Sequence, residues 1–279
     1  MYKIKINLMK KYCKYLFLIL LLAVTACAYR PRIVMQCVPL KEQCIIAKEP
    51  SHFSSSEKLK YSAALRGIPS ASLNLEIKGI ERVNNHDCYH IVADASPNSF
   101  FSLFFNVKYH VETYIDKDTG LSVKFYKKKT SSRKTNEETI VFDRDKKTAK
   151  CEYNDMRKKE IEINENTHDL LSFLYYFRMK GIEQDKTYDF NILYGGKIWP
   201  IQMKVTGIYL MKLRDGTCVN VFSVKLTSEL ISKIMGAPAL DAYVSADLRR
   251  VPIFFTAKTR MGESDSVLLN LDCLKGGKK

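Results

Sequence analysis

The sequence lacks the short motifs that mark most catalytic, nucleotide-binding and metal sites. It has no G-x-S-x-G nucleophile elbow, no P-loop, no H-E-x-x-H zinc motif and no G-x-G-x-x-G dinucleotide fingerprint. It also has no C-x-x-C pair, and its five histidines are scattered along the chain (His52, His86, His90, His110 and His168). These absences predict a protein that is not an enzyme and that holds no cofactor and no metal.

Apolar runs long enough to cross a bilayer are missing as well. The longest such run, Tyr15 to Val24, has ten residues, whereas a spanning helix needs roughly twenty. It follows a lysine-rich stretch, and no acidic residue precedes position 27. This pattern is typical of the signal peptide of an exported protein. The basic residues of the stretch are Lys3, Lys5, Lys10, Lys11 and Lys14.

The end of this leader carries a possible lipidation site. The sequence from Leu22 to Cys27, L-A-V-T-A-C, resembles the bacterial lipobox. The resemblance implies that residues 1–26 are removed and that Cys27 carries fatty acyl chains, which would anchor the protein stably in a membrane. The alternative is an ordinary small-residue cleavage site followed by a cysteine by chance. Ala28 follows the cysteine where the inner-membrane sorting signal of enteric bacteria would have Asp, so we expect the outer membrane, facing the periplasm. In a bacterium with a single membrane, the same signal would mean the cell surface, and the sequence does not distinguish the two.

Residues 27–56 have the composition of a tether. They contain three prolines and a serine run, with no sustained hydrophobic period. About 25 residues of flexible coil would span roughly 25 to 30 Å. The sequence therefore predicts a lipid-anchored segment that holds a folded domain away from the headgroups.

Six cysteines remain after the leader and the lipidated residue. An even number in an exported chain permits three disulfides, with fifteen possible pairings. Cys37 and Cys44 could close a small loop, whereas Cys88 and Cys218 each begin an apolar run in which a free cysteine acts as a small hydrophobic residue. The other two are Cys151 and Cys273.

From residue 57 onward, apolar and polar residues mostly alternate. Ala71 to Lys78 alternates strictly, as a half-buried antiparallel strand requires, and so does Tyr188 to Tyr194. One segment has helical spacing instead: Thr167 is a candidate N-cap for a helix over 167–180, and a shorter helix is expected from Ser228 to Met235. The pattern predicts a mainly β protein with one or two short helices.

An apparent internal repeat suggests how the strands are organised. Gly67 and Gly79 are twelve residues apart, as are Gly195 and Gly207, and a cysteine follows each pair at a similar distance. We expect two β-meander halves, about 57–163 and 185–273, joined by the helix into one large curved antiparallel sheet or split barrel. On this reading 57–273 is a single domain and 274–279 a basic tail. The alternative is a chance likeness between hairpins of similar length.

Several separated motifs resemble one family of exported bacterial proteins, known as domain of unknown function 3108. They occur in the family's order from about residue 55 to 272, and the resemblance implies a periplasmic, β-rich protein of unassigned activity. They are E-K-L-K-Y from Glu57, G-I-P from Gly67, C-Y-H-I-V-A from Cys88, N-S-F-F-S-L-F from Asn98, Y-I-D from Tyr114, D-L-L-S-F-L-Y-Y from Asp169 and R-R-V-P from Arg249.

The nearest approach to a catalytic constellation lies on one predicted strand. Alternation places His110, Glu112, Tyr114 and Asp116 on one face. A histidine beside two carboxylates can perform acid–base chemistry. The polar face of an ordinary strand has the same spacing, and we favour that interpretation.

An aromatic run is the best candidate for a binding site. Residues 99–105 contain four phenylalanines, Phe100, Phe101, Phe104 and Phe105. One interpretation is an apolar lip that binds a lipid or another hydrophobic ligand inside a curved sheet. The other is a short helix or loop that plugs the core of the sheet.

The net charge of +15 comes mainly from short stretches of the chain rather than from an even excess of basic residues. Five lysines lie in the leader, and residues 124–159 hold 13 basic and 6 acidic residues. We do not expect a nucleic-acid partner for an exported protein; the basic residues could instead face anionic headgroups, or simply protect a strand edge. The candidate membrane-surface patch is Lys127, Lys128, Lys129, Arg157, Lys158 and Lys159.

Two functions follow. The first is a lipid-anchored, non-catalytic module that binds a hydrophobic ligand or lipid in the cell envelope. The second is a structural or assembly partner of other envelope proteins, with a fully packed core. Whether the interior of the sheet is filled distinguishes them.

Overall fold

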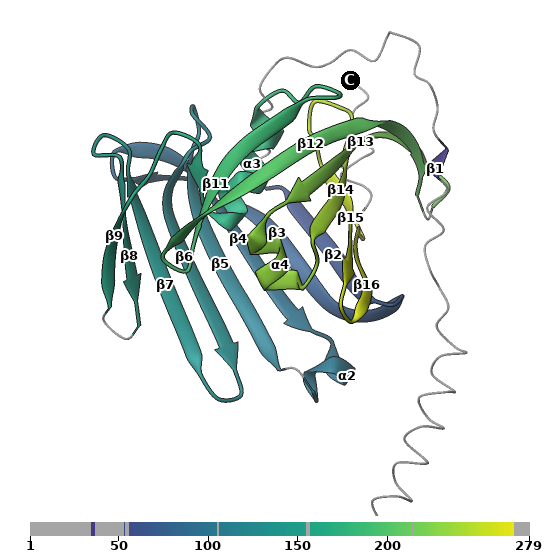
Figure 1. Ribbon diagram of the computed structural model, residues 1–279, viewed down its shortest axis with the longest axis horizontal. Helices are drawn as coiled ribbons and strands as arrows, with labels where there is room; N and C mark the ends of the chain where they lie inside the picture. Colours follow the sequence, from purple (N-terminus) through teal and green to yellow (C-terminus); the bar gives the residue numbers. More distant parts are fainter. Residues whose placement is uncertain are drawn as a thin grey trace, which may run out of the picture.

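The computed structural model describes residues 35–36, 53, 56–104, 106–154, 157–213 and 215–270. Almost all of this chain belongs to one strongly curved sheet (Figure 1). The first half is an antiparallel meander: β2 (Lys58–Leu65), β3 (Ile68–Val83), β4 (His86–Pro97), β5 (Val107–Asp116), β6 (Ser122–Ser131), β7 (Thr135–Asp143), β8 (Thr148–Tyr153) and β9 (Lys158–Glu162).

The second half is another antiparallel meander, and it joins the first edge to edge. Its strands are β11 (Thr187–Tyr194), β12 (Lys197–Lys212), β13 (Cys218–Thr227), β14 (Ala239–Ser245), β15 (Pro252–Thr259) and β16 (Gly262–Leu268). The last of them, β16, pairs antiparallel with β2. Two short strands complete the sheet: β10 (Thr167–His168) pairs with β11, and β1 (Met35–Gln36) pairs with β12.

The sheet is not closed by hydrogen bonds, because β9 and β10 end the strand order without pairing with each other. The prediction of a large curved antiparallel sheet or split barrel with short helices is therefore confirmed. Alternation explains the strands: along β12, Ile201, Met203 and Val205 are buried, whereas Gln202 and Lys204 between them are exposed.

The second glycine of the apparent internal repeat forms a bulge in both halves. The strands β3 and β12 each have 16 residues, and each contains a bulge at its glycine. Gly79 has a φ of 137° and Gly207 a φ of 157°, a backbone conformation that other residues rarely adopt. A short helix follows the next strand in both halves: α2 (Ser99–Ser102) after β4 and α4 (Glu229–Met235) after β13.

The longest helix, α3 (Leu170–Met179), joins the two halves and packs against both. Phe173 and Phe177 lie in the hydrophobic cluster of the second half. Leu171 and Tyr175 lie in the cluster of the first half. The helix therefore fills much of the space inside the curved sheet, and Figure 1 shows it between the strands of the two halves.

The helix begins two residues later than predicted. Asp169, not Thr167, is its N-cap: the carboxylate accepts hydrogen bonds from the backbone N–H groups of Leu171 and Ser172, both at 2.8 Å. Thr167 instead donates to the side chain of Asn164 at 2.8 Å, in the preceding turn. A carboxylate is favoured at a helix N-terminus by the helix dipole as well as by the hydrogen bonds. The shorter helix α4 begins as predicted, with Ser228 as its N-cap.

A third hydrophobic cluster packs β11 of the second half against strands β6 to β8 of the first half. Leu193 of β11 contacts the inner face of β6 to β8, including Phe125 and Ile140. The Nζ atom of Lys159 donates to the backbone oxygen of Gly196 at 2.7 Å, which links the β9 edge to the turn between β11 and β12. The two ends of the sheet thus meet through side chains.

Three residues of the predicted tether belong to the fold. Met35 and Gln36 form β1, and Phe53 is buried with its ring 5.3 Å from that of Tyr89 and 5.1 Å from that of Tyr175. Cys27, the rest of the leader and tether, and the predicted tail 274–279 lie outside the described residues. Among the described helices, none is both long and apolar enough to cross a membrane.

The three cysteines that the structure describes form no disulfide. Cys88, Cys151 and Cys218 are all free. Cys88 and Cys151 are buried as small hydrophobic residues, and burial raises the pKa of each thiol to about 11. Cys218 is exposed, so the prediction that it also packs as a hydrophobic residue is wrong. The other three, Cys37, Cys44 and Cys273, lie outside the described ranges.

Candidate functional site

The candidate site lies at one end of the sheet, here called the α2 end. It consists of α2 and the hairpin turns β2–β3, β6–β7 and β15–β16, which are all at the lower edge of Figure 1. The antiparallel order requires this, because every second turn of a meander lies at the same end. The turns β3–β4, β5–β6 and β14–β15 lie at the opposite end.

Hydrogen bonds to the end of β3 fix α2. The N-cap, Asn98, accepts from the backbone N–H of Phe101 at 2.9 Å. Its own backbone N–H donates to the oxygen of Ser70 at 2.9 Å, and its side-chain amide donates to the oxygen of Pro69 at 2.5 Å. One asparagine therefore starts the helix and attaches it to the neighbouring turn.

The apolar side chains of this helical turn face solvent. Phe100 is 53% exposed, Leu103 78% and Phe104 61%. The Phe100 ring lies 5.5 Å from the ring of Phe101 and 5.6 Å from that of Phe104, so the aromatic residues form one cluster. The interpretation of this run as a core plug is wrong, because no residue of α2 is buried. Phe105 lies outside the described residues.

The helix at the equivalent position in the second half, α4, packs against the core instead of facing solvent. There α4 buries Leu230 and Ile231 in the cluster that contains Trp199. Both helices follow the third strand of their half, and only α4 covers the core. The exposure of the α2 side chains is therefore specific to the first half and does not follow from the topology.

Three clefts on the described surface lie away from α2. Their volumes are about 440, 400 and 330 Å³. The first is formed mainly by β11, β12 and the loop 164–166, the second by the turns at the opposite end of the sheet, and the third by α3 and β11. None of the three is lined by a phenylalanine of α2, so the structure does not bring these residues to the mouth of any of these clefts.

The structure does not assemble the predicted basic patch. Strand alternation sends Lys127 to the inner face, where it forms an ion pair with the buried Glu138 and lies 4.1 Å from the centre of the Tyr194 ring. Lys128 points outward and pairs with Glu137 at 3.1 Å. The β6–β7 register places Lys127 and Lys128 each opposite a carboxylate, which a count of charges along the sequence does not reveal.

The other four basic residues of the predicted patch also have separate partners within the protein. Lys158 pairs with Glu152 at 2.8 Å, Lys159 donates to Gly196, and the Arg157 guanidinium lies 5.1 Å from the centre of the Tyr153 ring. Lys129 lies 5.5 Å from the centre of the Tyr109 ring. These six residues are not one continuous membrane-facing surface.

The histidine constellation is a cross-strand network on the outer face. Both carboxylate oxygens of Glu112 are used: Oε2 lies 2.8 Å from Nε2 of His90, and Oε1 lies 3.0 Å from Nε2 of His110. The Nδ1 atoms of the two histidines lie 2.7 Å from Glu81 and Asp94, respectively. His90, Glu81 and Asp94 were missed from the sequence because the β3–β4–β5 pairing brings them there.

Every imidazole nitrogen of this network has a carboxylate neighbour, so none is free for a substrate. Burial alone would lower the pKa of His110, but its hydrogen bonds to Asp94 and Glu112 raise it above the usual value. Tyr114 joins the network by donating to Glu112 at 3.3 Å. Asp116 does not; it lies at the end of β5 and bonds His86 at 2.8 Å. The favoured interpretation, a polar strand face, agrees with this geometry.

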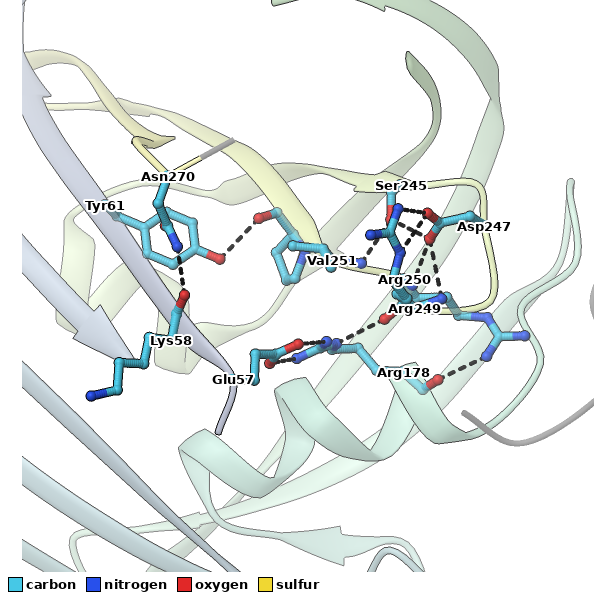
Figure 2. Close-up of polar contacts among 11 residues, drawn as sticks. Glu57, Lys58, Tyr61, Arg178, Ser245, Asp247, Arg249, Arg250, Val251 and Asn270 are labelled. Atoms are coloured by element: carbon cyan, nitrogen blue, oxygen red, sulfur yellow. Dashed lines mark hydrogen bonds and ion pairs between the residues drawn. The ribbon is translucent and has the colours of Figure 1, made fainter. Parts of the chain in front are cut away.

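A buried arginine joins three elements at the opposite end of the sheet (Figure 2). Arg178 of α3 is 1% exposed, and its guanidinium makes two hydrogen bonds to the Glu57 carboxylate, at 2.8 and 2.7 Å. Its Nε atom donates to the backbone oxygen of Arg249 at 3.1 Å, and its own backbone oxygen accepts from Arg250 at 2.7 Å. The pair holds together the C-terminus of α3, the residue before β2, and the β14–β15 loop.

The β14–β15 loop is itself rigid. The Asp247 carboxylate accepts from the Ser245 hydroxyl at 2.8 Å, from the Arg249 backbone N–H at 3.1 Å, and from the Arg249 guanidinium at 2.9 Å. The R-R-V-P motif at Arg249 is therefore explained by this joint. Every side chain of it is satisfied by another group of the protein, so we assign it to folding.

A second buried polar group lies at the start of α3. The hydroxyl of Thr113 donates to Asp169 at 2.7 Å, and the Ser122 and Ser172 hydroxyls are 2.5 Å apart. His168 beside them is fully buried, with its ring 4.4 Å from that of Tyr176, and neither of its nitrogens has a hydrogen-bond partner. Burial lowers the pKa of His168 to about 3. In the described part of the chain, no group of His, Cys, Asp and Glu residues could hold a metal ion.

One protein-family model matches most of the chain. The model of the family "Protein of unknown function (DUF3108)" matches residues 60–269. No curated protein matches the chain. A crystal structure of a β-barrel-like protein of domain of unknown function DUF1849 from Brucella abortus is similar, with a TM-score of 0.48 and 8% identity, covering 76% of this chain and 94% of that chain.

Proposed function

The chain belongs to the DUF3108 family, and we propose that it is a lipid-anchored, non-catalytic protein of the bacterial cell envelope that binds lipid through its α2 end. The observation that carries the lipid-binding part is the exposure of Phe100, Leu103 and Phe104 on one helical turn. Removing a large apolar side chain from water gains about 1.5 to 3 kcal/mol. Three such side chains at one tip favour an apolar partner over water.

The anchoring part rests on the sequence alone. A lipobox ending at Cys27 predicts acyl chains on that residue and export to the periplasmic face of the outer membrane. The described strands and helices all lie C-terminal to this position. A protein starting at Ala28 therefore keeps every described element, and it can be used to test lipid binding by the domain without the anchor.

The second candidate is an assembly partner of other envelope proteins, and the packed interior favours it. The α3 helix occupies the inside of the curve, and side chains close the sheet. A ligand enclosed in the sheet, as the sequence suggested, therefore has less support than a lipid bound at the exposed tip. Crosslinking in intact cells would support the second candidate if it captured a specific protein at the sheet edges β9 and β10 and no lipid dependence were found.

Vesicle flotation of residues 28–279 tests the proposal. The unsubstituted domain is expected to float with phospholipid vesicles, and Phe100→Ser/Leu103→Ser/Phe104→Ser is expected to bind at least tenfold more weakly, because apolar area buried in the bilayer is lost. Circular dichroism would establish that the variant folds, which is expected because these side chains support no core.

The matched control is Ile80→Ser. Ile80 is also 53% exposed but lies near the β3–β4 turn, at the opposite end. This variant is expected to bind like the unsubstituted domain. Equal binding by the triple variant, or no binding by the domain itself, would contradict the proposal.

A further inference from the structure

Five basic residues surround the exposed helix at the α2 end. Arg66 lies in the β2–β3 turn, Lys108 at the start of β5, Arg133 and Lys134 in the β6–β7 turn, and Arg260 in the β15–β16 turn; all are exposed. None of the five has a carboxylate within ion-pair distance among the residues that the structure describes. Between them, the stretch 98–106 that contains α2 has no charged residue.

The cations and the apolar tip belong to one continuous edge. The Arg66 side chain donates to the backbone oxygen of Met261 at 2.7 Å, which joins the β2–β3 and β15–β16 turns. Asn98 joins α2 to Pro69 at the start of β3, directly after the β2–β3 turn. Five neighbouring strands, from β16 through β2, β3 and β4 to β5, lie along this edge, and at about 4.8 Å between strands they span roughly 20 Å.

Two more apolar side chains extend the edge. Ile68 and Met261 are exposed in the turns on the far side of α2 from β5. Each lies close to a cation in the sequence: Met261 follows Arg260, and Ile68 lies two residues after Arg66. Apolar side chains and unpaired cations are thus mixed over the same surface.

The opposite end of the sheet provides an internal comparison. There several cations in the turns are neutralised: Lys117 lies 3.0 Å from Asp87, Lys146 lies 2.8 Å from Asp143, and Arg249 pairs with Asp247. Lys186, before β11, likewise pairs with Glu183 at 2.7 Å. The exposed Lys147 of the β7–β8 turn has no carboxylate within ion-pair distance among the described residues. The other four cations thus have carboxylate partners, whereas the five at the α2 end have none among the described residues and lie at the same end as an exposed apolar cluster.

We infer that the α2 end is a membrane-docking edge that selects bilayers with anionic headgroups, an inference that rests on the proposed function. Phe100, Leu103 and Phe104 enter the boundary between headgroups and acyl chains, as the apolar face of an interfacial helix does. The surrounding Arg and Lys side chains lie at the level of the phosphates, where long basic side chains keep their charge in the polar layer. A protein partner would need carboxylates placed opposite five separate cations, whereas an anionic lipid surface supplies mobile charges for all of them.

The test compares residues 28–279 on two vesicles, phosphatidylcholine alone and phosphatidylcholine with 30% phosphatidylglycerol. The variant Lys108→Gln/Arg133→Gln/Arg260→Gln is expected to bind the anionic vesicles about 100-fold more weakly, since each basic residue near an anionic surface contributes about a fivefold factor. Its binding to neutral vesicles should stay unchanged. Raising the salt concentration should weaken binding of the unsubstituted domain to the anionic vesicles only.

A matched control changes the net charge equally at the opposite end: Lys117→Gln/Lys146→Gln/Lys186→Gln should bind anionic vesicles like the unsubstituted domain. Equal losses for both triple variants, or salt-insensitive binding that does not distinguish the vesicles, would overturn the anionic selectivity while leaving lipid binding intact. Failure of the unsubstituted domain to bind either vesicle would instead remove the proposed function itself.

Discussion

Replacing Glu57 by glutamine is expected to lower the free energy of unfolding by about 3 to 5 kcal/mol. The substitution leaves the Arg178 guanidinium buried without its carboxylate, and an uncompensated buried charge costs about this much. Arg178 cannot move to solvent, because it is 1% exposed and lies 4.8 Å from the ring centre of Phe53 and 5.0 Å from that of Tyr175. Urea unfolding of Glu57→Gln at pH 7.5, followed by circular dichroism, measures the loss.

The double variant Glu57→Gln/Arg178→Met separates charge from packing. It removes both charges and keeps much of the side-chain volume, so most of the lost stability should return. A surface control is Glu76→Gln, whose carboxylate lies 2.8 Å from Lys58 and 2.6 Å from Lys78. This exposed network should tolerate the change with little shift in Tm. A single variant Glu57→Gln as stable as the unsubstituted protein would show that the joint in Figure 2 does not hold the fold together.

A second large effect is expected in acid. The pKa of the fully buried His168 is lowered to about 3, whereas an unfolded histidine has a pKa near 6.5. Below pH 6.5 the unfolded chain therefore gains a proton that the folded protein does not, and stability falls as the pH falls. At pH 4.5 this one group should remove about 2 to 3 kcal/mol relative to neutral pH.

The variant His168→Leu should lack this acid loss. Urea unfolding at pH 7.5 and at pH 4.5 is expected to show a smaller difference for His168→Leu than for the unsubstituted protein, by about 2 to 3 kcal/mol. His110→Gln is the control of opposite sign: because the folded pKa of His110 is raised, its contribution is present below pH 6.5 and is lost as the pH rises through that pKa. The same pH dependence in His168→Leu and the unsubstituted protein would contradict the assignment.

Much of the fold was predictable because it depends on local patterns. Alternation over residues 71–78 and 188–194 identified strands β3 and β11, and spacing at three and four identified α3. The twelve-residue interval between glycines predicted two related halves, and the structure shows a bulge at Gly79 in one and at Gly207 in the other. The N-cap was misplaced, since Thr167 and Asp169 are both good caps in sequence and only the fold shows which one faces the first helical turn.

What the sequence did not reveal depends on strand register and long-range contact. Lys127 was predicted at the surface, but the β6–β7 register pairs it with Glu138 on the inner face. The ion pair of Arg178 joins residues 121 positions apart. The candidate site was predicted in part: the phenylalanines were identified, whereas the cations near them come from three separate turns and the start of β5 and do not form a cluster in the sequence.

The central claim is that α2 enters a lipid bilayer, and the depth of a fluorophore placed there tests it most directly. The chain has a single tryptophan, Trp199, which is buried in the second half. In residues 28–279 with Phe104→Trp, vesicles containing brominated acyl chains are expected to quench the introduced indole and to leave the emission of Trp199 in the unsubstituted domain unchanged. Equal emission with brominated and ordinary vesicles, under conditions in which the protein is bound, would show that this end of the sheet stays out of the membrane.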